Sequence, residues 1–319
     1  MIKVNNNTIE IAARYFAGQE SGFSDFDKDI LSDVFEKIYT NQQIIINAGD
    51  GENIERCGLI DYLDWACQEF NIPHSSILII TPNRKLISNF VSCVIPLYIF
   101  NSAKYYITHS FERQSNTKFV GASIGRFSPS RFRLIYELDQ AFTNDTFLIF
   151  HPLPESVKKF YTNINDTYKK ELSWLESKKF DIDLVYPNEL SVNTIGWKDS
   201  YNNYHNIWNK FDIEIVAETD PNSNFWFTEK TARCIATGKP FLLLSGCRSL
   251  KILQDRGYTT FDEIIDESYD NETVPTRRIS KIISSLTELY QSPDRASKIN
   301  QLYQIAQHNI THYKKNVPQ

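Results

Sequence analysis

The segment 211–245 constrains the fold most, because it reads as a complete strand–loop–helix–strand unit. Phe211–Ala217 is apolar apart from two acids and predicts a strand, and Glu229–Thr237 predicts a helix. A turn at 238–240 leads into a second apolar run, 241–245. Strands that alternate with helices are typical of parallel sheets. The segment therefore predicts an α/β protein.

The same alternation recurs elsewhere in the chain. We expect further strands at 43–47, 76–81, 105–109, 118–124 and 147–151. We expect helices at 24–38, 54–70, 128–141, 154–180, 248–256 and 278–290, and a last one from Ser292. The apolar run 85–100 is read as a helix broken near Pro96. The whole chain is therefore expected to be α/β, with helices at its end.

Composition excludes several classes of protein. The 319 residues, 41% hydrophobic and 23% charged, suffice for two domains. No apolar run approaches the roughly 20 residues that span a bilayer, and residues 1–7 lack the apolar core of a signal peptide. Five scattered cysteines indicate reduced thiols. A net charge of −5 and a pI near 5.8 weigh against a general nucleic-acid binder. We expect a cytoplasmic protein with no membrane partner.

Two acidic residues stand where a strand–helix unit touches a ligand. Glu218 follows the strand 211–217, and Glu229 lies in the first helical turn beside Lys230. Ligands bind at the carboxyl ends of parallel strands, and phosphates are favoured at helix N-termini. A carboxylate suits the hydroxyls of a ribose or sugar, whereas Lys230 suits phosphates. The pattern indicates a nucleotide-sugar site.

The same stretch resembles the α-fucosyltransferases. The matching segments are Ala-Glu-Thr at 217–219, Phe-Thr-Glu-Lys at 227–230 and Thr-Gly-Lys-Pro at 237–240. Over 211–270 the chain also resembles glycosyltransferase-like proteins of tailed phages and large viruses, with the segments 257–261 and 266–270. Thr219 stands where fucosyltransferases have Asn, so the sugar stays open.

The resemblance implies a GT-B fold, with two Rossmann-like domains and a C-terminal helical tail. We then expect an acceptor-side α/β domain over 1–165 and a nucleotide-sugar-binding domain over 166–290. The last helix, 291–319, would pack back on the first domain.

The resemblance also implies roles for residues near the helix at 229. Glu229 would hold ribose hydroxyls, and Lys230 would hold a phosphate. Glu218 would either contact the transferred sugar or order the loop after the strand. Thr228 would cap the helix, and its backbone N–H could meet phosphate.

Two arginines form a second candidate for the donor site. Arg126 and Arg131 follow the strand 118–124, and Ser128-Pro129 suits a helix start. Fucosyltransferases have an arginine here that reaches the diphosphate, and Arg131 matches it. Arginine suits this role because its planar fork binds two oxygens. The alternative is an exposed arginine at a helix start.

A glycine-flanked acidic loop is the candidate source of a general base. Asp50 and Glu52 follow the strand 43–47, and in GT-B enzymes this region faces the acceptor. Direct displacement by an acceptor hydroxyl needs a base within hydrogen-bond reach. Turn chemistry explains the loop equally well, and His109 is the next candidate base.

No metal is expected. The acidic run 262–270 lacks the tight Asp-x-Asp spacing of metal-dependent transferases, and it is read as a solvated turn.

The sequence therefore predicts a glycosyltransferase that moves a sugar from a nucleoside diphosphate sugar to a hydroxyl, with no further cofactor. The viral resemblance suggests a hydroxylated base in phage DNA as acceptor, in the host cytoplasm; a glycan or small molecule is the alternative. A non-catalytic nucleotide-sugar-binding or scaffold protein is the rival interpretation.

Overall fold

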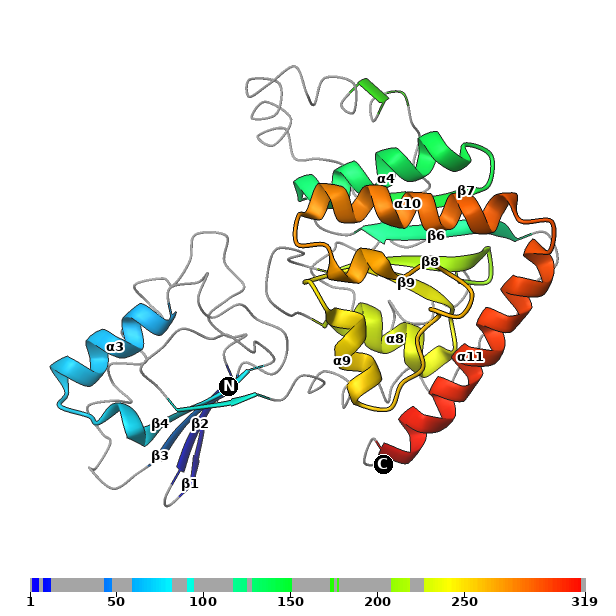
Figure 1. Ribbon diagram of the computed structural model, residues 1–319. Helices are drawn as coiled ribbons and strands as arrows, with labels where there is room; N and C mark the ends of the chain where they lie inside the picture. Colours follow the sequence, from blue (N-terminus) through cyan, green and yellow to red (C-terminus); the bar gives the residue numbers. More distant parts are fainter. Residues whose placement is uncertain are drawn as a thin grey trace, which may run out of the picture. The chain divides into compact units, whose positions relative to one another are not determined.

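A computed structural model describes residues 2–5, 8–12, 43–47, 59–81, 91–94, 117–124, 128–150, 173–174, 177, 208–218 and 227–316. These parts contain two sheets, each with parallel strands, and six α-helices. Figure 1 shows their arrangement within each part of the chain. The expected α/β class is confirmed.

The chain divides into two compact units. Unit 1 comprises Met1–Asn101 with Asn224–Thr228, and unit 2 comprises Ser102–Ser223 with Glu229–Gln319. This division differs from the boundary that we expected at 165. The strands at 118–124 and 146–150 belong to unit 2, because the first of them pairs with the strand at 211–217.

Unit 1 contains a sheet in the order β1-β2-β3-β4-β5 and the helix α3 (Leu59–Glu69). Only β1–β2 is antiparallel. The strands are β1 (Ile2–Asn5), β2 (Thr8–Ala12), β3 (Gln43–Asn47), β4 (Ile77–Thr81) and β5 (Val91–Val94). Ile44, Ile46, Ile77 and Ile79 are fully buried, whereas the residues between them are partly exposed. This period of two indicates that one face of the sheet carries the core.

Unit 2 contains a parallel sheet in the order β7-β6-β8-β9. Its strands are β6 (Lys118–Ile124), β7 (Thr146–Phe150), β8 (Phe211–Ala217) and β9 (Phe241–Leu244). Every residue of β8 is buried, as expected for a strand covered on both faces. Gly121 of β6 makes this packing possible, because an added Cβ would lie 2.4 Å from the Phe211 ring.

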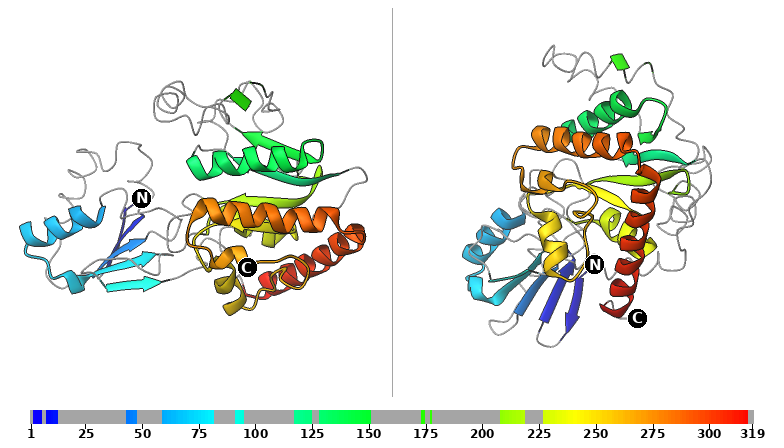
Figure 2. Two further views of the ribbon diagram at one scale, coloured as in Figure 1. Left: turned by 45° about the horizontal axis from the view of Figure 1, so that its top comes forward. Right: turned by 45° about the vertical axis from the view of Figure 1, so that its right-hand side comes forward.

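Helices cover the second sheet on both faces (Figures 1 and 2). Right-handed crossovers place α4 (Pro129–Phe142) and α8 (Glu229–Thr237) on opposite faces, because they lead to strands on opposite sides. α10 (Pro275–Gln291) packs against α4, and α11 (Arg295–Asn316) packs against α8. α9 (Ser249–Asp255) follows β9. The last helix therefore packs within unit 2.

Local sequence explains where these helices begin and end. Ser128 caps α4 with extended backbone, and its hydroxyl accepts from the Arg131 N–H at 3.4 Å, while Pro129 occupies the first turn. Gly238 follows α8 with φ of +72°, and Ile310 and Gln307 of α11 leave no room for a side chain there. The expected helix start at Ser128-Pro129 is confirmed.

One prediction differs from the structure, and others lie outside the described residues. Within the run 85–100 the described residues form the strand β5, not a helix, because a short apolar run has no distinguishing period. The antiparallel pair β1–β2 was not predicted. The strand at 105–109, the helix at 24–38 and most of the helix at 154–180 lie outside the described residues. None of the described helices is long and apolar enough to cross a bilayer.

Candidate functional site at the carboxyl edge of the second sheet

The strand order of the second sheet reverses between β6 and β8. From β6 the chain runs through α4 to β7 on one side, and it later returns to β8 on the other. In parallel α/β sheets, ligands bind beyond the carboxyl ends of the strands at such a reversal. The parallel strands β2–β5 of unit 1 lie in sequence order instead. The described sheets therefore contain one reversal, and it lies where β6 and β8 end.

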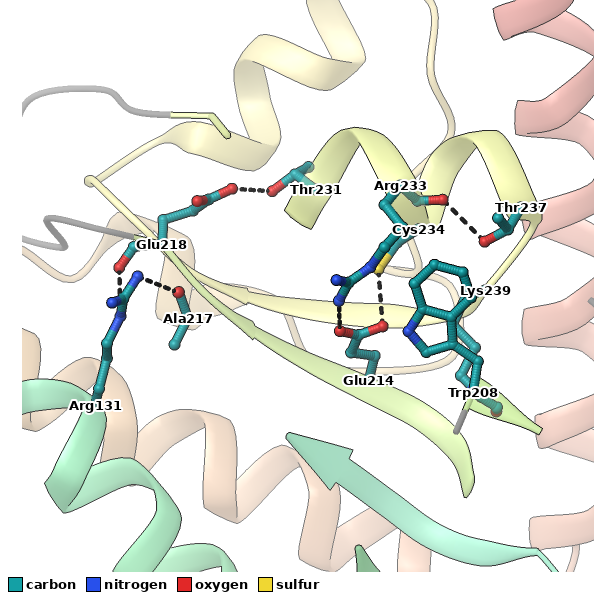
Figure 3. A network of polar contacts seen from close by, with 10 residues as sticks. All are labelled: Arg131, Trp208, Glu214, Ala217, Glu218, Thr231, Arg233, Cys234, Thr237 and Lys239. Carbon is teal, nitrogen blue, oxygen red and sulfur yellow. Dashed lines mark hydrogen bonds and ion pairs between the residues drawn. The ribbon is translucent and has the colours of Figure 1, made fainter. Parts of the chain in front are cut away.

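Arg131 connects the two strands at this point. It stands in the first turn of α4, and its side chain is only 3% exposed. Its Nε donates to the Glu218 carbonyl at 3.2 Å, and its Nη2 donates to the Ala217 carbonyl at 2.9 Å (Figure 3). The guanidinium therefore binds the end of β8. Arg131 is not an exposed arginine, and its expected contact with a diphosphate stays a prediction.

Glu218, directly after β8, is fully buried. Its carboxylate accepts from the Thr231 hydroxyl at 2.5 Å, and Thr231 lies in the first turn of α8 (Figure 3). Its backbone N–H donates to the Leu244 carbonyl at 2.9 Å. Glu218 therefore stands at the predicted place, and the described contact of its carboxylate is with α8.

The predicted phosphate-side residues stand at the start of α8. The helix begins at Glu229 with Lys230 next to it, as predicted, and Thr228 precedes it with a side chain only 4% exposed. Lys230 is partly exposed. A helix start at the carboxyl edge offers backbone N–H groups and the positive end of the helix dipole. Lys230 and the helix start therefore suit an anion, whereas the Glu229 carboxylate suits hydroxyl groups.

Other predicted site residues lie outside the described parts of the chain. They are Arg126, the candidate bases Asp50 and Glu52, and His109. Their roles stay predictions.

A second buried network, which the sequence analysis missed, lies deeper between β8 and α8. Glu214 forms an ion pair with Arg233, and the Cys234 thiol donates to the same carboxylate at 3.3 Å (Figure 3). The Arg233 guanidinium also lies 4.6 Å from the Trp208 ring centre. Burial raises the pKa of the Cys234 thiol well above its ordinary value, and the Glu214 charge raises it further. The thiol is therefore a neutral packing group.

Lys239 completes this network just beyond Gly238. Its side chain is 1% exposed, and Nζ donates to the carbonyls of Trp208, at 2.7 Å, and Phe211. The sequence held a signal for the network, because a carboxylate inside an otherwise apolar strand needs a partner. Arg233 and Lys239 are the buried cations of the helix and turn that follow.

The acidic run 262–270 forms a turn in which some carboxylates are exposed to solvent and others are buried. Asp270 accepts from the N–H groups of Leu250 and Lys251 at 3.1 and 3.3 Å, and so caps α9. Glu267 is 9% exposed and accepts from the Phe261 N–H at 2.9 Å, whereas its Oε2 has no hydrogen-bond partner. Burial raises the pKa of Glu267 to about 7. The expectation of a solvated turn is therefore wrong for these two residues.

The described residues contain no cluster of His, Cys, Asp and Glu side chains suited to a metal ion. No protein-family model matches this chain, and no curated protein matches it either. The resemblance to fucosyltransferases and viral proteins therefore stays a prediction.

Proposed function

We propose that this protein is a nucleotide-sugar-dependent glycosyltransferase whose donor site lies at the carboxyl edge of the second sheet. The observation that carries the proposal is the reversal of strand order between β6 and β8, beside which Arg131, Glu218 and the start of α8 gather. A reversal of this kind is where α/β sheets bind nucleotides. The residues gathered there are those expected for a nucleoside diphosphate sugar.

The start of α8 would hold the donor. Lys230 and the first N–H groups of the helix neutralise the diphosphate, because a helix N-terminus favours anions. Glu229 accepts hydrogen bonds from the ribose hydroxyls. Lys230 cannot fill this role, because an ammonium group has no acceptor. Binding of this kind positions the anomeric carbon and stabilises the charge of the departing diphosphate.

Unit 1 would serve the acceptor, in the GT-B manner. Direct displacement at the anomeric carbon needs a base for the acceptor hydroxyl, and Asp50 or Glu52 is the proposed source. The proposed acceptor is a hydroxylated base in phage DNA, with a glycan or small molecule as the alternative. Asp50→Asn and Glu52→Gln, made separately, test the base: one should lower turnover and leave donor affinity unchanged.

A donor panel tests the proposal most directly. Thermal unfolding should be followed with GDP, UDP, GDP-fucose and UDP-glucose, and with GMP and UMP as controls that lack the second phosphate. We expect a diphosphate to raise the midpoint while its monophosphate does not. If no member of the panel shifts the midpoint, a donor site for these nucleotides is refuted.

Turnover separates the transferase from the rival interpretation. A donor that binds should also be hydrolysed slowly or transferred to hydroxymethylated DNA, to oligosaccharides or to small hydroxylated acceptors. Tight binding without hydrolysis or transfer to any acceptor would identify a nucleotide-sugar-binding or scaffold protein instead.

A further inference from the structure

Glu218 is the point where three elements of unit 2 meet. Its N–H donates to Leu244 of β9 at 2.9 Å, and its carbonyl accepts from Arg131 of α4 at 3.2 Å. Its carboxylate accepts from Thr231 of α8 (Figure 3). One residue thus carries a separate hydrogen bond to each of the three neighbours. All of them lie at the carboxyl edge of the sheet.

We propose that Glu218 is a positioning residue, which holds the first turn of α8 in the orientation that the donor requires. This proposal rests on the proposed function where it concerns ligand binding. The Glu218 side chain is 0% exposed, and its described hydrogen bond runs to the helix. The two roles expected for this residue were contact with the sugar and ordering of the loop after β8; the described contact instead orders the start of α8.

The contact with Thr231 matters because of its place in the helix. Thr231 directly follows Lys230, so a fixed Thr231 also fixes the rotation of α8 about its axis. That rotation sets the direction of the Lys230 side chain and of the first backbone N–H groups. Small errors in the position of binding groups are costly, because the binding energy depends on their alignment. Anchored at Thr231, the helix start is preorganised for an anion.

Arg131 holds the other side of the same junction. Its two described donors reach consecutive carbonyls, Ala217 at 2.9 Å and Glu218 at 3.2 Å. A planar guanidinium can bind both at once, which a lysine ammonium on a flexible stem cannot reproduce. Arg131 therefore fixes the end of β8. Glu218 stands at that end, and its hydrogen bond to Thr231 fixes the first turn of α8 relative to the strand.

Substitutions at Thr231 test the proposal in the full chain. Thr231→Val keeps the shape and removes the hydroxyl, and Thr231→Ser restores the hydroxyl. Thr237→Val is the matched control, because the Thr237 hydroxyl at the other end of α8 is also buried and donates to the Arg233 carbonyl at 2.9 Å. The two valine variants thus make the same chemical change at the junction and away from it, and the serine variant keeps the hydroxyl at the junction.

Two measurements are needed. Hydrogen exchange of the amides of α8 reports the helix start without any ligand. Calorimetry with GDP and UDP reports the donor site. For Thr231→Val we expect the exchange rate of the amides that bond back to the first turn of α8, from position 233 on, to rise by about tenfold, the loss typical of one hydrogen bond. The dissociation constant of whichever nucleotide binds the wild type should rise by the same factor. Thr231→Ser should restore both the wild-type exchange rate and the wild-type dissociation constant. Thr237→Val should change neither the exchange at the helix start nor the dissociation constant.

Each other outcome overturns the proposal. Unchanged exchange in Thr231→Val shows that the contact does not anchor the helix. Faster exchange with unchanged affinity shows an anchor without a role in binding. Weaker binding that Thr231→Ser does not restore, or that comes without faster exchange, shows that Thr231 contacts the ligand itself.

Failure of the proposed function is distinguishable from failure of this inference. If neither GDP nor UDP binds the wild type, the donor site for these nucleotides is refuted, and with it the role of Glu218 in binding, while exchange alone decides whether Glu218 anchors α8. If Thr231→Val does not fold, the double variant Glu218→Gln/Thr231→Val removes the carboxyl group together with the hydroxyl and supports the same measurements.

Discussion

Two buried glutamates face α8 from the same side of β8, and they differ in their described side-chain contacts. Glu214, inside the sheet, pairs with the Arg233 guanidinium. Glu218, four residues later at the carboxyl edge, accepts from the neutral hydroxyl of Thr231. Both residues are at most 2% exposed, so burial does not distinguish them.

The difference indicates which acid serves packing and which serves the site. A buried carboxylate with its own cation forms a closed pair that joins strand to helix. The Glu218 carboxylate instead contacts the first turn of α8, at the positive end of the helix dipole. Glu214, inside β8, thus serves packing, whereas Glu218, at the carboxyl end of the strand, belongs to the proposed ligand site. The predictions below test this separation.

The largest expected effect is the loss of stability when the structural pair is broken. Arg233→Met leaves the Glu214 charge buried without its cation, which should lower the free energy of unfolding by about 3–5 kcal/mol. Urea unfolding at neutral pH measures this. Arg133→Met is the control, because the Arg133–Glu137 pair is a partly exposed i,i+4 pair worth less than about 1 kcal/mol.

Arg233→Met also tests whether the Glu214 network is separate from the ligand site. Measured below its unfolding transition, Arg233→Met should keep the nucleoside diphosphate affinity of the wild type. A large loss of affinity in the folded protein would show that the Glu214 network also belongs to the site.

Glu267 shows the cost of a buried carboxylate that forms no ion pair with the described residues. Its pKa is raised from 4.5 to about 7, mainly by burial, so the folded protein keeps a proton that the unfolded chain releases above pH 4.5. Stability should therefore fall by about 3 kcal/mol as the pH rises from 4.5 to 7, and then level off. The same desolvation raises the pKa of Asp270, which adds to the fall in the same direction.

Glu267→Gln should flatten this dependence, because the amide does not titrate. Urea unfolding at intervals between pH 4.5 and 8 measures it, and Glu263→Gln, on an exposed residue of the same turn, is the control. An unchanged slope in Glu267→Gln would place the titrating group elsewhere.

A smaller effect is expected where charge serves binding. Lys230→Ala should weaken nucleoside diphosphate binding by about 1.5–3 kcal/mol, the range for charge-assisted hydrogen bonds. Its melting temperature without ligand should stay near that of the wild type. Lys251→Ala on α9 is the matched control, since that exposed lysine pairs with Asp255. Equal affinities of the two variants in calorimetry would remove Lys230 from the site.

The smallest effect is expected for Glu229→Gln, which keeps the shape and removes the charge. Hydrogen bonds from ribose hydroxyls would then go to a neutral oxygen, so donor affinity should fall by about 1 kcal/mol. The ligand-free melting temperature should change little. A marked loss of ligand-free stability with unchanged affinity would support a role in the helix dipole instead.

The sequence predicted most elements well where the hydrophobic period was long or a cap was present. The bounds of β6, β8 and α8 agree with the prediction, and Ser128-Pro129 marked the start of α4. It failed at β5, where an apolar run looked like a helix. It also missed β1–β2, although apolar residues alternate on both sides of Asn6-Asn7.

The sequence predicted which residues belong to the candidate site, but not which of them contact one another. Glu218 and Lys230 stand at the strand end and helix start where they were expected. Arg131 was assigned to a phosphate, whereas its described contacts are with strand carbonyls. No local pattern reports such a contact, since the residues that meet are 86 and 87 positions apart.

The sequence by itself determined the alternation of strands and helices, and the polar residues that punctuate 211–240, because period and capping are local properties. Only the tertiary structure decided that β6 lies beside β8, and hence that β6 and β7 belong to unit 2. Apolar strands of similar pattern do not specify their neighbours, because strand order follows from the packing of the whole sheet. The same packing brings Arg131, Glu218 and Thr231 together at one edge.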